Sequence, residues 1–239
     1  MNSEDESEMD ANVEDSGDDS AGSFMSRYVS DRIRSSVRDS EMFSFLREMA
    51  RDELGWVHQL LHQSTEFTQA LSARAALPSD GVAYRAMTAQ HAREEVGLPA
   101  DLRVWMAIVG ISVDAGARRT AMTPETMTLV AHNWYVAQRL PPSEQVVAMN
   151  LVSEYAALDF FTEAIVALRR CGFPLSKFWR VHRDADEVHA QMGTELICDG
   201  ASLMDARDRV SSLVDLARHT ANLYRAALDS WVRVARIRP

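Results

Sequence analysis

Three side chains that can bind a metal recur at helical spacing in the last third of the chain: His182, Asp186 and His189. Separations of four and three residues place them on one face of an α-helix. The rest of that face is apolar, and ionisable groups that face a core without a partner cost several kcal/mol each. Two imidazoles and a carboxylate form half of a site suited to iron. We therefore predict a metal-binding helix; a polar, solvent-exposed helix is the alternative.

Two other helices carry acidic residues that could complete such a site. Glu154 occupies a position that the helical spacing of its apolar neighbours assigns to the core. A carboxylate in that position needs a cation, an arginine partner or a raised pKa. On an earlier helix, His91 and Glu95 are four residues apart, and Glu94 is the alternative to Glu95. A surface His–Glu pair is the competing interpretation of that helix.

Helices must position these side chains, because strand-like alternation is absent from the sequence and proline sits in the breaks between helical segments. Ser40 is expected to restart a helix after a break, and Ser176 to cap the helix that carries the three predicted ligands. Thr123 and Pro124 supply an N-cap and a first-turn proline. The expected helices span about residues 26–53, 56–77, 82–97, 99–109, 124–140, 143–170, 177–198 and 202–239. We predict an all-α bundle.

In chain order the helices present a carboxylate, a second carboxylate and then His, Asp and His. This order resembles the heme-oxygenase-like diiron oxidases and oxygenases, whose final metal helix carries H-x3-D-x2-H. His182, Asp186 and His189 match that motif position for position. Glu154 fits the single Glu that the family places on the preceding metal helix. The resemblance covers roughly residues 40–230 and implies a heme-oxygenase-like helical bundle of about seven to eight helices.

The first metal helix of that family is matched less completely. The segment from His91 to Gly97 resembles the family's H-x-x-E-E-x-G, which makes Glu95 the preferred ligand and Glu94 the alternative. Members usually supply another His three or seven residues after the first Glu, and this chain has leucine at both positions after Glu95. Either His91 or Asp101 supplies the missing ligand, or one metal is held by fewer protein groups.

The resemblance implies a non-heme diiron enzyme that uses O2 to oxidise or oxygenate a small amine, amino acid or fatty acid in specialised metabolism. Its cofactor would be Fe(II), as two ions. Related proteins with this fold often form dimers, so a homodimer is also expected. The implied metal ligands are Glu95, Glu154, His182, Asp186 and His189, with His91, Glu94 and Asp101 as further candidates.

Three alternatives to that function can be weighed against the sequence, and the first of them finds no support in it. A ferritin-like site would use two Glu-x-x-His motifs, and no histidine of this chain has Glu three residues before it. A cofactor-free member of the same fold, thiaminase-like or quinone-synthase-like, is the second. The thiaminase-like form needs a cysteine that faces the cavity, and both Cys171 and Cys198 fall at expected helix ends. A non-catalytic, degenerate binding protein is the third.

Composition limits the class of protein further. The chain has 239 residues and a net charge of −10, with the acidic excess concentrated in residues 1–23. We expect those residues to form a disordered acidic tail and residues 24–239 to form a single helical domain. The nearly neutral domain carries no basic patch, which argues against nucleic acid as a ligand. We expect a cytoplasmic protein, because signal-peptide and membrane-spanning patterns are absent and the only two cysteines form no CxxC pair.

Overall fold

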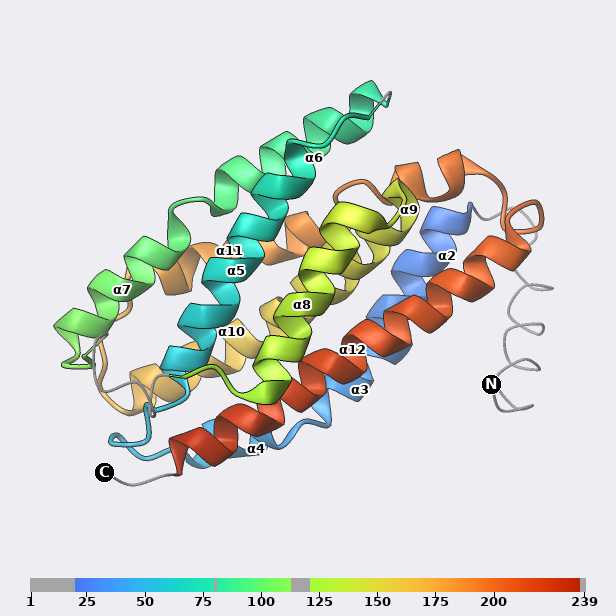
Figure 1. The fold of residues 1–239 in the computed structure, drawn as a ribbon. Helices are drawn as coiled ribbons and strands as arrows, with labels where there is room; N and C mark the ends of the chain where they lie inside the picture. Colours follow the sequence, from blue (N-terminus) through green and yellow to red (C-terminus); the bar gives the residue numbers. More distant parts are fainter. Residues whose placement is uncertain (1–19, 80, 113–120, 237–239) are drawn as a thin grey trace.

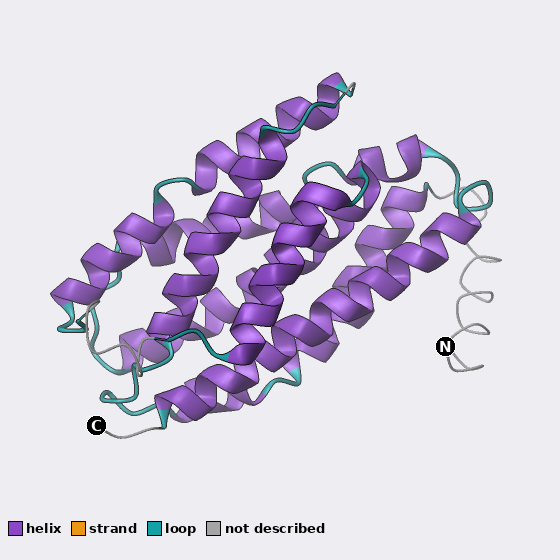
Figure 2. Cartoon of the chain, in the orientation of Figure 1, coloured by secondary structure: helices purple, strands orange, loops and turns teal. Residues whose placement is uncertain are grey.

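The computed structural model describes residues 20–79, 81–112 and 121–236, and these residues form helices joined by short loops (Figures 1 and 2). The expectation of an all-α bundle is confirmed. No helix of the described residues is both long and apolar enough to cross a membrane.

The first rod begins earlier than the sequence indicated. Helix α2 (Ala21–Tyr28), the π-helix η1 (Val29–Ile33) and α3 (Arg34–Arg38) follow one another without a break. Ser20 caps α2, and its side chain accepts a hydrogen bond from the backbone N–H of Ser23. Ala21 is fully buried, so residues 20–23, predicted to end the acidic tail, belong to the bundle. Residues 1–19 of that tail lie outside the described part of the chain.

The predicted break at Ser40 is present, and its side chain accepts a hydrogen bond from the N–H of Met42 at the start of α4 (Glu41–Glu48). The next helices are α5 (Val57–Ala75), α6 (Val82–Glu95) and α7 (Leu98–Ile108). Helix α8 (Pro124–Arg139) has the predicted cap, since the Thr123 side chain accepts a hydrogen bond from the N–H of Thr126. Local capping chemistry therefore sets several helix boundaries close to where the sequence predicts them.

The second half of the chain contains a feature that the sequence did not indicate. One long rod consists of α9 (Pro142–Gln145), the π-helix η2 (Val146–Val152) and α10 (Ser153–Arg170). Every residue of η2 is buried. Wider π turns inside α-helices are frequent at functional sites, and this one ends two residues before Glu154.

The predicted helix 177–198 is shorter than expected. Helix α11 (Lys177–Gln191) ends before Gly193, whose φ of +80° lies in the left-handed region that glycine adopts without strain. The 3₁₀-helix η3 (Thr194–Gly200) follows, and α12 (Arg207–Ala235) completes the bundle. Ser202 and Asp205 hydrogen-bond to each other as a capping pair would, but α12 starts only at Arg207.

Aromatic packing fixes α11 against α10. The Phe161 ring lies 5.8 Å from that of Trp179 and 4.1 Å from the imidazole of His182, measured between centroids. Trp56 and Trp105 also contact Trp179 edge to face, from the start of α5 and from α7. Such pairs contribute roughly 0.5–1.5 kcal/mol each beyond their buried area. The orientation of the α11 face that carries the predicted ligands is therefore set by a rigid aromatic cluster.

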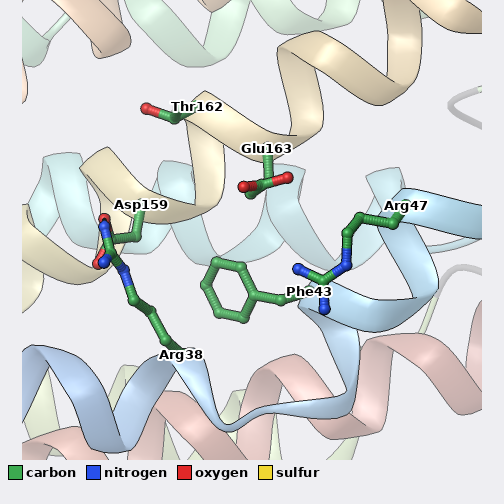
Figure 3. A pocket seen from close by; sticks show the side chains of 6 residues that line it. All are labelled: Arg38, Phe43, Arg47, Asp159, Thr162 and Glu163. Atoms are coloured by element: carbon green, nitrogen blue, oxygen red, sulfur yellow. Dashed lines mark hydrogen bonds and ion pairs between the residues drawn. The ribbon is translucent and has the colours of Figure 1, made fainter.

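A partly buried ion pair joins α10 to α3, in which Asp159 is buried and the arginine side chains remain partly exposed. Arg34 donates two hydrogen bonds to the carboxylate of Asp159, at 2.8 and 2.6 Å, and Arg38 donates a third. Figure 3 shows the surface pocket beside this pair, which Arg47 and Glu163 also line. Glu163 follows Glu154 by nine residues, which is half a turn out of phase on a helix of 3.6 residues per turn. The pocket therefore lies on the other side of α10 from the predicted metal ligands.

Candidate metal centre

The three predicted ligands of α11 point into the protein. His182 is 6 % exposed, Asp186 is fully buried and His189 is 1 % exposed. The alternative interpretation, a polar helix in contact with solvent, is therefore wrong. An inward face with two imidazoles and a carboxylate requires a compensating partner.

Carboxylates from two other helices meet this face. Glu95 lies at the end of α6 and Glu154 near the start of α10, and both are buried. The Nδ1 atom of His189 lies 3.4 Å from Glu95 Oε1 and 3.7 Å from Glu154 Oε2. The Nε2 atom of His182 lies 3.8 Å from Glu95 Oε2. Five predicted ligands from three helices thus converge on one small volume.

Asp186 is the residue that most needs a cation. Both of its carboxylate oxygens are buried without a hydrogen-bond partner among the described residues, and so is Nδ1 of His189. Leaving a buried polar group unpaired costs about 1–3 kcal/mol, and more for a charged group. Donor atoms of Glu95, Asp186 and His189 all lie within 4.8 Å of one another. Oxygen and imidazole donors in this arrangement suit a divalent iron ion.

Each imidazole of α11 has one nitrogen engaged by the protein and one directed at the carboxylates. Nδ1 of His182 donates a hydrogen bond of 2.8 Å to the backbone carbonyl of Phe178, which leaves Nε2 as the free donor atom. Nε2 of His189 lies 2.8 Å from Glu94 Oε2, which leaves Nδ1. Metal-binding histidines almost always have such an outer hydrogen bond, because it fixes the tautomer and the ring orientation.

The further candidates are placed differently from one another. Glu94 contacts the outer nitrogen of His189, and its side chain is 44 % exposed, so its position fits a contact that orients His189 better than it fits a metal ligand. Asp101 lies on α7 with its carboxylate 3.6 Å from Nζ of Lys177. It belongs to neither group of described residues whose donor atoms lie close enough to share a metal, so the geometry gives no support to Asp101 as the replacement ligand. His91 is fully buried, with Nε2 3.0 Å from Glu154 Oε1.

The cluster shifts the pKa values of its members in opposite directions. Burial, followed by the charge of Glu154, raises the pKa of Glu95 to about 8, and burial with the charges of both glutamates raises that of Asp186 well above its ordinary value. Burial alone would also raise the pKa of Glu154, but the His91 and His189 imidazoles lower it to about 2.

The two imidazoles of α11 also differ in pKa. Burial lowers the pKa of His182 to about 4. For His189, burial is outweighed by the neighbouring glutamates, which raise the pKa to about 9. Without a metal, the site therefore holds protons that a cation must displace.

Replacing Glu94 and Glu95 separately tests which of the two is a ligand. Glu95→Gln is expected to weaken Fe(II) binding more than about 100-fold, since a ligand should count for more than the 10–100-fold typical of outer hydrogen-bond partners. Glu94→Gln is expected to fall within or below that outer range, because its amide oxygen still accepts from Nε2 of His189. Anaerobic Fe(II) titration measures both. Equal losses would contradict the assignment, and a larger loss for Glu94→Gln would reverse it.

Sequence reasoning missed two buried polar residues beside the cluster, Arg74 on α5 and Asn150 on η2. Asn150 donates to Nδ1 of His91 and accepts from Arg74. Its position four residues before Glu154 was a usable signal, because that spacing puts both side chains on one helix face. Arg74 gave no local signal, since its partners come from other helices.

Comparison with known proteins places the chain in one family, and the structural neighbours have the fold of that family. Residues 54–225 match the heme-oxygenase-like family model described as iron-containing redox enzyme. A search of curated proteins gave no significant match. A domain of unknown function with a heme oxygenase-like fold from Shewanella denitrificans OS217 is 16 % identical, with a TM-score of 0.68 over 87 % of this chain and 90 % of that one. A TenA homolog from Pseudomonas syringae pv. tomato DC3000 is 12 % identical, with a TM-score of 0.68 over 84 % of this chain and 88 % of that one. At these identities the structural neighbours establish the fold.

Proposed function

Because the chain belongs to the heme-oxygenase-like family of iron-containing redox enzymes, we propose that it is a non-heme diiron oxidase or oxygenase that uses O2. The proposed ligands are Glu95, Glu154, His182, Asp186 and His189, and the proposed cofactor is two Fe(II) ions. The proposed substrate is a small amine, amino acid or fatty acid.

The single observation that carries this proposal is the unpartnered, fully buried carboxylate of Asp186. A structural ion pair would have supplied it with an arginine, as Asp159 has Arg34. Instead, the groups around Asp186 are further metal donors, Glu95 and His189. Neutral imidazoles with several carboxylates match the ligand preference and the charge of Fe(II).

Iron bound here would supply the activation of O2. The contribution of the protein is to hold the ligands, through the carbonyl of Phe178 on His182 and through Glu94 on His189. The protein also limits the access of water, because the aromatic rings of Phe161 and Phe178 pack against His182. A dry, preorganised site strengthens every charge interaction in it.

A narrow pocket lies against three of the proposed ligands, Glu95, Glu154 and His182. An apolar pocket adjoins it and shares four lining residues, Gln63, Ala157, Phe161 and Tyr224. The side chains that line the second pocket carry no charge; they are Leu60, Gln63, Leu129, Ala156, Ala157, Phe160, Phe161, Tyr224, Ala227, Leu228 and Trp231. This lining favours a substrate whose apolar portion extends away from the metal.

The alternative functions have less support. A thiaminase-like mechanism needs a cysteine that faces the cavity, and neither Cys171 nor Cys198 lines the two pockets beside the ligands. Burial also raises the pKa of the Cys198 thiol, which disfavours the reactive thiolate. In a degenerate binding protein, nothing would compensate for keeping the unpaired Asp186 and four further donors buried together, and that arrangement costs stability.

Anaerobic addition of Fe(II) followed by O2 tests the proposed function. We expect the purified protein to bind two equivalents of Fe(II) and to develop a transient visible absorption on exposure to O2. The matched control is His182→Ala, which removes one donor from the same helix and should lose both properties while its helical circular dichroism is kept. A protein that takes up no iron and consumes no O2 would instead be the degenerate binding member.

A further inference from the structure

A continuous chain of buried hydrogen bonds leads from the guanidinium of Arg74 to the cluster of proposed metal ligands. Arg74 is 1 % exposed, and Asn150 and His91 are fully buried. Arg74 donates a 2.8 Å hydrogen bond to Oδ1 of Asn150, and Nδ2 of Asn150 lies 3.1 Å from Nδ1 of His91. Nε2 of His91 in turn lies 3.0 Å from Oε1 of Glu154. Three residues outside the proposed ligand set thus form a hydrogen-bonded chain that ends at one proposed ligand, Glu154.

His91 lies close enough to the cluster to be considered a ligand. Donor atoms of His91, Glu154 and His189 all lie within 4.8 Å of one another, and the missing family histidine leaves a coordination position to fill. Whether Nε2 of His91 has a free lone pair or a proton decides between the two roles. The neighbours of Asn150 settle that question.

Two neighbours fix the orientation of the Asn150 amide independently. The guanidinium of Arg74 only donates hydrogen bonds, so the amide oxygen must face it. The backbone carbonyl of His189 only accepts, and it lies 3.3 Å from the amide nitrogen. The amide nitrogen therefore faces His91 and donates to its Nδ1.

This donation fixes the His91 tautomer. Because Nδ1 accepts a hydrogen bond, a neutral imidazole carries its proton on Nε2. That Nε2–H then donates to Oε1 of Glu154. The lone pair that would bind a metal is the one engaged by Asn150, on the far side of the ring.

We propose that His91 is a positioning residue that orients Glu154, held in one tautomer by Asn150 and Arg74, and that it does not bind the metal. The proposal rests on the proposed metal site and assigns a role within it. The buried guanidinium also places a positive charge on the same hydrogen-bond chain as the Glu154 carboxylate. The missing family histidine is then not replaced by His91, and one ion has fewer protein ligands.

The π-helix gives this network its geometry. Asn150 lies in η2 and Glu154 follows at the start of α10, four residues later. Wider turns change the phase of a helix relative to a regular α-helix, and both side chains face α6, where His91 lies. Tyr84, also on α6, accepts a hydrogen bond from Nε of Arg74 and donates to Gln145. Arg74 is thereby held from two helices.

Two variants of His91 distinguish a positioning residue from a ligand. The side-chain amide of His91→Gln places an N–H close to the position of Nε2, whereas that of His91→Asn reaches only the position of Nδ1. We expect Fe(II) affinity within about threefold of wild type for His91→Gln and a loss of about 10–100-fold for His91→Asn, the range for outer-shell hydrogen bonds to a ligand. His132→Gln, which replaces a histidine on α8 bonded to Thr220, is the control and should retain wild-type affinity.

A count of bound imidazoles provides a readout that a purely structural role would not change. In the Co(II)-loaded protein, exchangeable ring protons of ligand histidines give strongly shifted NMR signals. We expect two such signals, from His182 and His189, in wild type and in His91→Gln alike. Three signals in wild type and two in His91→Gln would overturn the proposal, as would equal loss of Fe(II) affinity in both His91 variants or no loss in either. Failure of wild type to bind Fe(II) or Co(II) would instead refute the metal site itself.

Discussion

Asp186→Leu is expected to abolish Fe(II) binding and to stabilise the metal-free protein. Leucine has the branched shape of aspartate, but it replaces two buried, unpartnered oxygens by methyl groups. Removing such unsatisfied atoms should raise the free energy of unfolding by about 1–3 kcal/mol. For a protein of this size, that corresponds to a rise in Tm of about 2–4 °C per kcal/mol. Thermal unfolding of the metal-free protein and anaerobic Fe(II) titration measure the two effects.

Asp159 is the matched control, because it is a buried aspartate on a neighbouring helix that does have partners. Asp159→Leu should lower Tm, because it leaves the Arg34 guanidinium without its ion pair, and should leave Fe(II) affinity close to wild type. A metal-free Asp186→Leu protein that is less stable than wild type would show that Asp186 supports the fold. Retained iron binding would show that it is not a ligand.

The affinity for Fe(II) is expected to rise steeply with pH between about 6.5 and 9. In the metal-free protein the pKa of Glu95 is raised to about 8 and that of His189 to about 9. Both groups therefore hold protons at neutral pH, and a metal must displace them. Calorimetric titrations in buffers of different ionisation enthalpy should detect protons released on binding, and fewer of them as the pH approaches 9. A pH-independent affinity would contradict this expectation.

The stability of the metal-free protein should change in the opposite direction. A group whose pKa is raised by folding contributes stability below its ordinary pKa and loses it as pH rises through the raised value. The stability that Glu95 contributes is lost as the pH rises to about 8. The stability that His189 contributes is lost between about pH 6.5 and pH 9. The metal-free Tm should therefore fall across this interval, and less so in Glu95→Gln, which does not titrate.

Most of the fold could be predicted from local signals. Ser40, Thr123 and Pro124 mark helix starts through side-chain and backbone chemistry that acts within a few residues, and the structure has the helices where those signals place them. The π-helix before Glu154 was not predictable, because the wider turns depend on packing against other helices. Helix α11 ends earlier than its periodic pattern because Gly193 turns the chain with a positive φ.

The candidate site shows the same division. Spacing alone placed the three donors of α11 on one face, and the interruption of an apolar stripe indicated Glu154. Spacing could not decide which of Glu94 and Glu95, the last two residues of α6, faces the other predicted ligands. That choice depends on how the helix is rotated within the bundle, which the sequence does not give. Their roles depend on contacts with His189, which lies 95 residues further along the chain.

Buried charge also escaped the sequence analysis. Arg74 resembles any arginine of a helix surface until the bundle is assembled, and only then do Tyr84 and Asn150 surround its guanidinium. Asp101 was proposed as a ligand by counting along the chain, whereas it faces Lys177. Tertiary contacts, which local patterns do not encode, decide both cases.

Anomalous diffraction at the iron absorption edge, from crystals equilibrated with Fe(II) under anaerobic conditions, is the most direct test of the metal centre. We expect iron peaks at bonding distance from the Asp186 carboxylate and from Nδ1 of His189, with Glu95, Glu154 and His182 as the remaining protein ligands. Iron peaks elsewhere, or no peak while Asp186 keeps its position, would contradict the proposed site.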